Sequence, residues 1–315
     1  MPIIYHHISA LRNALNPYRG QQNGKQRIAL VPTMGNLHDG HLELVKLAKQ
    51  HADIVVVSIF VNPTQFGVGE DFDSYPRTLD EDVAKLTTVN ADYVFAPSID
   101  EMYPVLPPPT SVRAGAITSQ LCGQSRPSHF DGVGIVVSKL FNIVQPEVAV
   151  FGQKDYQQLA IIQQLVRDLS YPIKIIGAPI VRAADGLALS SRNQYLTDSE
   201  RNIAPMLHQE LQRLADQLMN GAYIERGLEH LLAAASARIT AAGFIIDYLE
   251  VKTAQLDAFE IDGKSTTFAG NQQDLVILVA AWLGRARLLD NQLVTVTLLS
   301  LAREWLDAMY KDDGL

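Results

Sequence analysis

Cysteine is nearly absent from this sequence, since Cys122 is the only one among 315 residues. One thiol excludes an internal disulfide framework and any metal site made of several thiolates, and a reducing compartment suits such a protein. The start of the chain, residues 1–19, also lacks the long apolar run of a signal peptide or membrane helix, because charges and histidines interrupt it. We therefore predict a cytoplasmic protein with no membrane partner.

Positive charge is in short supply as well. Lysine and arginine number 26 against 34 aspartate and glutamate residues, which gives a formal net charge of -8 and a pI near 5.5. This balance argues against a broad basic surface, so we predict no nucleic-acid partner. The composition, 47% hydrophobic and 19% charged, is that of a globular protein, and the length allows one large or two modest domains.

The first half of the chain alternates short apolar runs with helical patterns. Five runs bounded by turn residues have the character of buried parallel strands: Ile28–Val31, Ile54–Val61, Tyr93–Ala96, Val148–Phe151 and Ile173–Ile176. Apolar residues at helical spacing lie between several of them, as at Leu159, Ile162 and Leu165. The alternation predicts an α/β fold, a doubly wound parallel-sheet (Rossmann-like) domain over residues 1–182.

The rhythm changes after Arg182. Two long helical patterns, residues 198–219 and 225–241, precede two apolar runs that predict strands at 245–251 and 275–282, with a turn at 262–273. We expect a smaller α+β lid domain over residues 183–290. Residues 291–315 are predicted to form a helical extension whose apolar stripe is Leu298, Leu301, Ala302, Trp305, Leu306 and Met309.

The first predicted strand ends in a turn with two glycines and two histidines that leads straight into a helix. In open α/β sheets, ligands bind at this carboxyl edge. His38 and His41 share one face of the helix start, where unpaired N–H groups and the helix dipole attract phosphate. Gly35 and Gly40 allow close approach of a nucleotide. An isolated pair of histidines in a turn lies on the surface in about half of cases, but the strand, turn and helix context favours a site.

The fourth predicted strand ends in a similar way. Gly152 permits close approach, Lys154 can meet a phosphate, and Asp155 can reach a ribose or cap the helix. Gln158 lies one helical turn beyond Lys154 and can face the same cleft. The alternative reading of this segment is a simple capped turn.

Two further segments carry polar groups suited to small ligands. Asn62 and Gln65 follow the second strand, and their amides suit a substrate with hydroxyl and carboxylate groups. The run Ser190, Ser191 and Arg192 offers hydroxyls and a guanidinium for triphosphate oxygens. Read alone, residues 62–64 would be an ordinary turn.

Together these segments resemble the pantothenate synthetase family. The His-Asp-Gly-His at residues 38–41 is similar to the H-x-G-H signature of class I aminoacyl-tRNA synthetases and nucleotidylyltransferases, and the longer string 32–41 is most similar to pantothenate synthetase. Four more motifs follow in the family's order, at Val61–Phe66, Tyr75–Arg77, Gly152–Leu159 and Leu189–Asn193. The resemblance spans about residues 1–290, and five ordered motifs are a far stronger signal than one.

The resemblance implies an ATP-dependent condensation of (R)-pantoate with β-alanine to give pantothenate, AMP and pyrophosphate through a pantoyl adenylate. It implies Mg²⁺ bound mainly through the ATP phosphates, with no metal site of the protein's own, and a homodimer. The residues implied as catalytic are His38, His41, Lys154 and Arg192. The others implied for ATP binding are Met34, Gly35, Asn36, Leu37, Asp39, Gly40, Gly152, Gln153, Asp155, Val181, Leu189, Ser190 and Ser191. Those implied for substrate binding are Gln65, Gln158, Asn62 and Tyr75.

The sequence departs from the family pattern in small ways. Gln153 stands where the family usually has Glu, Leu189 where it has Met, and Ser128 where it has Gly. No residue stands out as the base that deprotonates β-alanine. Two rival functions are a nucleotidylyltransferase, which would need an extra cationic site for an acceptor phosphate, and a catalytically dead nucleotide-binding regulator, in which eroded phosphate-binding groups are expected.

Overall fold

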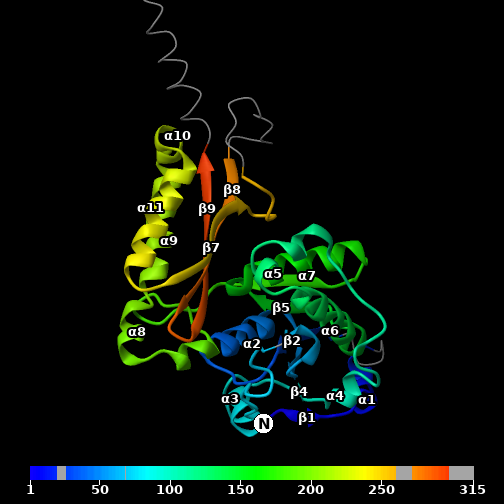
Figure 1. Cartoon of the computed structure of the whole chain (residues 1–315). Helices are drawn as coiled ribbons and strands as arrows, with labels where there is room; N and C mark the ends of the chain where they lie inside the picture. The colour runs from blue at the N-terminus through cyan, green and yellow to red at the C-terminus, as the bar shows by residue number, and fades with distance from the viewer. Residues whose placement is uncertain (20–25, 68, 260–271, 298–315) are drawn as a thin grey trace, which may run out of the picture. The chain divides into compact units, whose positions relative to one another are not determined.

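The computed structural model describes residues 1–19, 26–67, 69–259 and 272–297. It divides into two compact units (Figure 1). The first comprises Met1–Arg182 and Leu189–Ser191, and the second comprises Ala183–Ala188 and Arg192–Leu315. No helix in the described ranges has the length and apolar character needed to cross a membrane.

The first unit is built on a six-stranded sheet in the order β1-β4-β3-β2-β5-β6, with every strand pair parallel. Its strands are β1 Ile3–Tyr5, β2 Ile28–Thr33, β3 Ile54–Ile59, β4 Tyr93–Phe95, β5 Val148–Gly152 and β6 Lys174–Ala178. The central strands β2 and β3 are buried almost throughout, which explains their continuous Val and Ile runs. The predicted parallel α/β fold is confirmed.

Helices cover this sheet and bury their apolar stripes against it (Figure 1). They are α1 Ile8–Arg19, α2 Asp39–His51, α3 Leu79–Thr88, α4 Ile99–Met102, α5 Cys122–Ser125, α6 His129–Val144 and α7 Tyr156–Asp168. Val45 of α2 and Leu86 of α3 join Val31 and Val57 of the sheet in one core cluster. Short 3-10 turns at Pro63–Gln65 and Gln153–Asp155 follow β3 and β5 at the carboxyl edge of the sheet.

The second unit pairs an antiparallel sheet with helices packed along it (Figure 1). The strands are β7 Ile245–Thr253, β8 Gln272–Leu283 and β9 Ala286–Thr297, and the helices are α8 Asp198–Ile203, α9 Met206–Met219, α10 Ala222–Arg226 and α11 Leu228–Ala241. Each of the two long predicted helices is interrupted. Pro205 caps α9 after α8 has ended, and Gly227, at φ 81, separates α10 from α11. The lid role predicted for residues 183–290 stays a prediction.

The predicted start of a helical extension at residue 291 is wrong. Residues 291–297 complete β9, which pairs with β8 along its whole length from Leu283 opposite Ala286 to Gln272 opposite Thr297. The reason is visible in residues 294–296, where buried Val294 and Val296 flank an exposed residue with the two-residue period of a strand. The predicted stripe Leu298 to Met309 and the greater part of the predicted turn at 262–273 lie outside the described residues.

Candidate active site

The strand order of the first unit reverses between β2 and β5. After β2 the chain adds β3 and β4 on one side, whereas β5 and β6 lie on the other, and residues 29–30 pair directly with 148–149. Ligands of doubly wound sheets bind at the carboxyl ends of the strands that flank such a switch point. The segments that leave those two ends are 34–41 and 153–155, so the topology brings two of the predicted motifs to one place.

His38 and His41 cap the start of α2 in a reciprocal arrangement. The Gly40 N–H donates to His38 Nδ1 at 3.1 Å, and the His38 N–H donates to His41 Nδ1 at 3.3 Å. Because a backbone N–H can only donate, both Nδ1 atoms are acceptors, and the proton of each neutral ring is on Nε2. The two ring centroids are 4.1 Å apart. The pair therefore offers two Nε2–H donors at a helix N-terminus.

Both imidazoles are uncharged at neutral pH. Burial, and after it the charge of Lys154, lowers the pKa of His38 to about 4. Burial, and after it the repulsion that a protonated His41 would feel from a protonated His38, lowers the pKa of His41 to about 3, with smaller contributions from Lys154 and Lys85. Two ammonium groups and a helix N-terminus thus create a positive environment in which the rings act as hydrogen-bond donors.

Gly40 has a packing role that the sequence does not reveal. A Cβ at this position would come 2.8 Å from Cε1 and 2.9 Å from Nδ1 of His38, so only glycine lets the His38 ring fold back onto the helix start. The same Cβ would meet Leu189 at 3.8 Å, which brings the predicted residue Leu189 next to the histidine motif. The Leu189 N–H donates to the Val181 carbonyl at 2.9 Å, so Val181 and Leu189 are held together.

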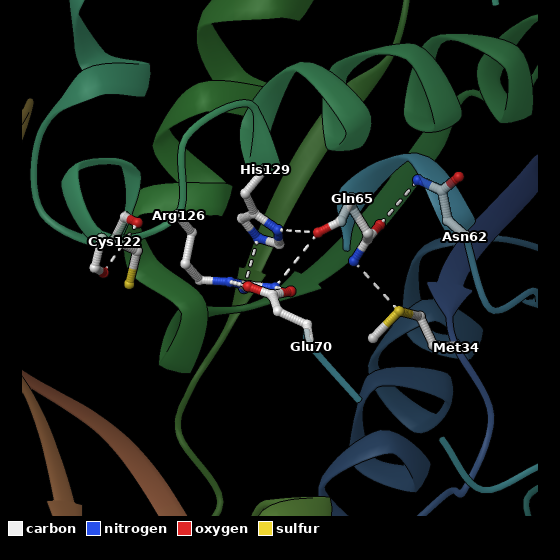
Figure 2. Close-up of polar contacts among 8 residues, drawn as sticks. Met34, Asn62, Gln65, Glu70, Cys122, Arg126 and His129 are labelled. Carbon is white, nitrogen blue, oxygen red and sulfur yellow. Dashed lines mark hydrogen bonds and ion pairs between the residues drawn. The ribbon is translucent and has the colours of Figure 1, made fainter. Parts of the chain in front are cut away.

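Gln65 is oriented by a buried network that begins at Tyr103, and Figure 2 shows its contacts with Asn62 and Met34. The Tyr103 hydroxyl donates to Asn62 Oδ1 at 2.9 Å, and Asn62 Nδ2 donates to Gln65 Oε1 at 3.1 Å and to the Gly132 carbonyl at 3.0 Å. Gln65 Nε2 is then a donor, with the weakly accepting Met34 sulfur at 3.3 Å. Asn62 is 1% exposed, and its amide holds Gln65 in place.

The backbone of Gln65 is held from the other side by residues that sequence reasoning did not assign to the site (Figure 2). Its carbonyl oxygen accepts from His129 Nδ1 at 2.8 Å, and His129 Nε2 accepts from Arg126 Nη1 at 3.2 Å. Arg126 also forms a two-point ion pair with Glu70, at 2.7 and 2.5 Å. Burial, followed by the Arg126 charge, lowers the pKa of His129 to about 4, so this ring is a neutral structural link.

α6 approaches the Gln65 turn so closely that glycine is required. A Cβ on Gly132 would lie 2.2 Å from the Thr64 carbonyl oxygen and 2.6 Å from the Gln65 nitrogen. A Cβ on Gly134 would likewise lie 2.7 Å from the Val112 carbonyl oxygen, so both glycines of α6 serve close packing. Tyr75, predicted to bind substrate, is 8% exposed and packs edge-on against Phe66 at 6.0 Å.

The second predicted motif leaves β5 beside the histidines. Lys154 lies near enough to both imidazoles to lower their pKa values after the effect of burial, and its ammonium is 3.8 Å from Asp155 Oδ1. Gln158 is half-buried in the first turn of α7, next to the fully buried Gln157, which donates to the carbonyls of Ile117 and Gln120. Gln153 packs against Gly177, whose Cβ would lie 3.3 Å from its Cγ.

The turn between β2 and α2 is gripped by two residues of α3 that the sequence analysis missed. Asp82 Oδ1 accepts from the Leu37 N–H at 2.7 Å and Oδ2 from the Asn36 N–H at 3.0 Å. Lys85 Nζ donates to the Leu37 carbonyl at 2.7 Å. A sequence carries no local signal for such contacts, because the partners are more than forty residues apart in the chain.

The last predicted motif is divided between the units. Ser190 and Ser191 belong to the first unit and are half-buried, whereas Arg192 belongs to the second. Within the described part of the chain, no group of three or more His, Cys, Asp or Glu side chains could hold a metal ion.

Known sequences match this chain over nearly its whole length. A family model described as Pantoate-beta-alanine ligase matches residues 3–293. A pantothenate synthetase of Psychrobacter arcticus is 76% identical over 296 residues, which cover 94% of this chain and 99% of that protein. A pantothenate synthetase of Acinetobacter baylyi is 54% identical over 284 residues, which cover 90% of this chain and 95% of that protein.

Solved structures give the same match. The crystal structure of pantothenate synthetase from Thermus thermophilus is similar with a TM-score of 0.80 and 39% identity, covering 92% of this chain and 98% of that one. The pantoate-beta-alanine ligase from Francisella tularensis, complexed with beta-gamma ATP and beta-alanine, is similar with a TM-score of 0.73 and 34% identity, covering 93% of this chain and 98% of that one.

Proposed function

This chain belongs to the pantoate-beta-alanine ligase family, and on that premise we propose that it joins (R)-pantoate to β-alanine with ATP through a pantoyl adenylate. The observation that carries the proposal is the reciprocal cap of His38 and His41 at the switch point of the sheet. It supplies two oriented donors where charge builds up during attack on a phosphate. The Francisella tularensis relative, complexed with beta-gamma ATP and beta-alanine, supports the choice of substrates.

The first half-reaction depends on stabilising negative charge on the phosphate oxygens more than on proton transfer. A carboxylate with an ordinary pKa of about 4 is already ionised at neutral pH, so pantoate can attack the α-phosphate without a base. The bond from that carboxylate oxygen to phosphorus forms as the bond to pyrophosphate breaks. We assign His38, His41 and Lys154 to the phosphate oxygens, together with Ser190, Ser191 and Arg192.

We propose that Mg²⁺ binds together with the nucleotide. The groups assigned to ATP are mainly donors and cations, and the nearby carboxylates are Asp39 and Asp155, so the protein side suits a triphosphate that brings its own ion. When bound, Mg²⁺ neutralises charge on the phosphate oxygens. The remaining residues assigned to ATP binding lie at or after the carboxyl ends of three strands. Met34 to Gly40 follow β2, Gly152 and Gln153 lie at the end of β5, and Val181 and Leu189 come after β6.

Gln65 and Gln158 are proposed to hold pantoate. The Asn62 bond turns the Gln65 amide so that Nε2 is available to a substrate oxygen, in exchange for a weak contact to sulfur. Asn62 and Tyr75, which are buried, shape this region from beneath. In the second half-reaction the β-alanine amine attacks the acyl carbon, the nitrogen loses a proton, and AMP leaves.

We also propose a homodimer that works in the cytoplasm. The cytoplasm supplies ATP and suits a chain with one cysteine, and the dimer rests on the family resemblance. Sedimentation equilibrium gives the mass directly. A mass equal to one chain of 34.7 kDa at micromolar concentration would rule the dimer out.

Isotope exchange tests the proposed intermediate. Enzyme, ATP, Mg²⁺ and pantoate should exchange labelled pyrophosphate into ATP with no β-alanine present. Gln158→Ala should weaken pantoate-dependent exchange by about 1 to 3 kcal/mol, because a buried substrate oxygen loses its partner. Gln164→Ala on the same helix α7 is the matched control and should exchange normally. Exchange without pantoate would overturn the substrate assignment, and a strict need for β-alanine would argue against a free adenylate.

A further inference from the structure

The turn before His38 forms a small anion-binding nest that a side chain of the protein already fills. Gly35 and Asn36 both have left-handed backbones, at φ 82 and 50, and this turns the N–H groups of residues 36 and 37 to one side. The carboxylate of Asp82 accepts from both, at 3.0 and 2.7 Å, and is fully buried. A nest of this kind elsewhere binds phosphate, so here the carboxylate serves to fix the turn.

Thr78 completes the support of that carboxylate. Its hydroxyl donates to Asp82 Oδ2 at 3.3 Å, and a Cβ on Gly35 would come within 3.1 Å of the same oxygen. The backbone at Gly35 therefore passes directly over the carboxylate. Lengthening Asp82 or adding a side chain at Gly35 would move the turn.

Lys85 grips the same turn one helical turn along α3. Its ammonium donates to the Leu37 carbonyl at 2.7 Å. That carbonyl belongs to the peptide group whose N–H is the His38 N–H, and this N–H donates to His41 Nδ1. A chain of two hydrogen bonds thus runs from Lys85 through one rigid peptide plane to the ring of His41. A cation on the carbonyl polarises the peptide group and strengthens the N–H as a donor.

We propose that Lys85 and Asp82 are positioning residues for adenylation: Lys85 orients His41 through the peptide group between Leu37 and His38, and Asp82 fixes the turn that leads into it. The inference rests on the proposed role of the histidines. Neither residue needs to touch ATP. The Nε2–H of His41 keeps its direction because Nδ1 of the same ring accepts from the His38 N–H. Lys85 of α3 holds that peptide group in place.

Lys49 and Asp92 provide a matched control on the same unit. Asp92 Oδ2 accepts from the Val55 N–H at 2.7 Å and from Lys49 Nζ at 2.6 Å, so a carboxylate and a lysine again hold backbone and side chain together. These contacts lie at the start of β3, the opposite edge of the sheet from the histidines. Their loss would report on stability without reaching the turn at residues 35–38.

The test compares Lys85→Met, Lys85→Arg and Asp82→Asn with Lys49→Met and Asp92→Asn. Pantoate-dependent pyrophosphate exchange gives kcat and the KM for pantoate, and nitrogen NMR of histidine-labelled enzyme without ligands gives the tautomer of His41. Lys85→Met should lower kcat about 10- to 100-fold, the scale of a misplaced catalytic group, with less than about a threefold change in KM. It should also give His41 a mixture of tautomers. Lys85→Arg should recover most of kcat, because a guanidinium can still donate to the carbonyl.

Several results would overturn the inference. Lys85→Met with the parental kcat and a single His41 tautomer would show that the contact has no bearing on His41. An equal loss in Lys49→Met would assign the effect to stability. If Asp82→Asn fails to fold, the Lys85 variants still decide. If the unchanged enzyme shows no pantoate-dependent exchange, the proposed function falls, whereas the tautomer of His41 in Lys85→Met still tests the positioning.

Discussion

His38 and His41 should be neutral Nε2–H donors in the free enzyme. The size of their pKa shifts decides between hydrogen-bond donation and general acid catalysis. Burial, followed by neighbouring charges, lowers the pKa values to about 4 and about 3. At pH 7 about one molecule in 10⁴ then carries a protonated His41. Populating that form costs about 5 kcal/mol, since each pH unit corresponds to about 1.4 kcal/mol. General acid catalysis typically contributes about 10² to 10⁴, so the cost cancels the gain and hydrogen-bond donation prevails.

The assay is long-range proton to nitrogen NMR on enzyme labelled in its histidines, titrated from about pH 8 to about pH 5. Asparagine variants at positions 38 and 41 assign the signals. We expect an unprotonated Nδ1 and a protonated Nε2 in both rings, with no titration near about pH 6.5, the ordinary histidine value. Bound ATP should raise both pKa values because its phosphates favour the charged ring, so the ligand-free enzyme is the state to measure.

The corresponding kinetic measurement is kcat/KM for pantoate in the exchange reaction, which reports groups of the free enzyme. No limb near about pH 6.5 should trace to either histidine. A His41 signal that titrates near that pH, or a proton found on Nδ1, would refute both the reciprocal cap and the donor role derived from it. The His38→Asn variant keeps the backbone N–H at position 38 and loses the imidazole. A single His41 tautomer in this variant would show that the N–H contact, and not the contact between the two rings, fixes the His41 tautomer.

Four other outcomes follow from the same contacts. His41→Ala should keep the fold and slow adenylation by about 10² to 10³ in rapid quench, the scale of one lost preorganised donor. Arg192→Lys should be nearly as damaging as Arg192→Ala, because lysine keeps the charge and loses the fork; full recovery of exchange with lysine would mean that charge alone suffices. Truncation after Thr297 should spare activity, whereas truncation after Asp290 removes more than half of β9 and should lower the melting temperature. The free energy of unfolding should be fully retained above about pH 6.5 and fall from there toward about pH 4, because the unfolded chain takes up protons first. The fall should be up to about 1.4 kcal/mol per pH unit for each imidazole with a lowered pKa. A free energy of unfolding that stays flat across this range in urea titrations would contradict those pKa values.

The sequence predicts what is local. Continuous β-branched runs predict buried strands such as Ile54–Ile59, and the position of the histidine motif between a strand and a helix predicts a ligand site. The three-residue strand β1, in contrast, is too short to carry a pattern, and it is defined by pairing with β4. β9 does have an alternating pattern, but its strand character depends on β8, and the apolar residues beyond it invite a helical reading of the whole tail.

Contacts between distant segments are beyond the reach of the sequence for a physical reason. Asp82 lies in the acidic first turn of α3 and Lys85 in its last turn, as is ordinary for a helix, and only the fold places them against the peptide groups before His38. The buried state of Asn62 likewise depends on Tyr103 and on Gly132, which come from other parts of the chain. The sequence could therefore predict that these motifs follow the strand ends, whereas it could not predict which distant side chains hold them in place.

The pairing of β2 with β5 has a consequence for how the protein folds. The two halves of the candidate site leave strands that meet only when residues 29–30 find residues 148–149, so a long loop must close first. The β8 and β9 hairpin forms by short-range contact from Leu283 opposite Ala286, and Trp282 lies on β8 beside that turn. In a Trp305→Phe variant, Trp282 is the one remaining tryptophan. During refolding its fluorescence should recover early, and nucleotide binding should return only with the slower closure of the parallel sheet.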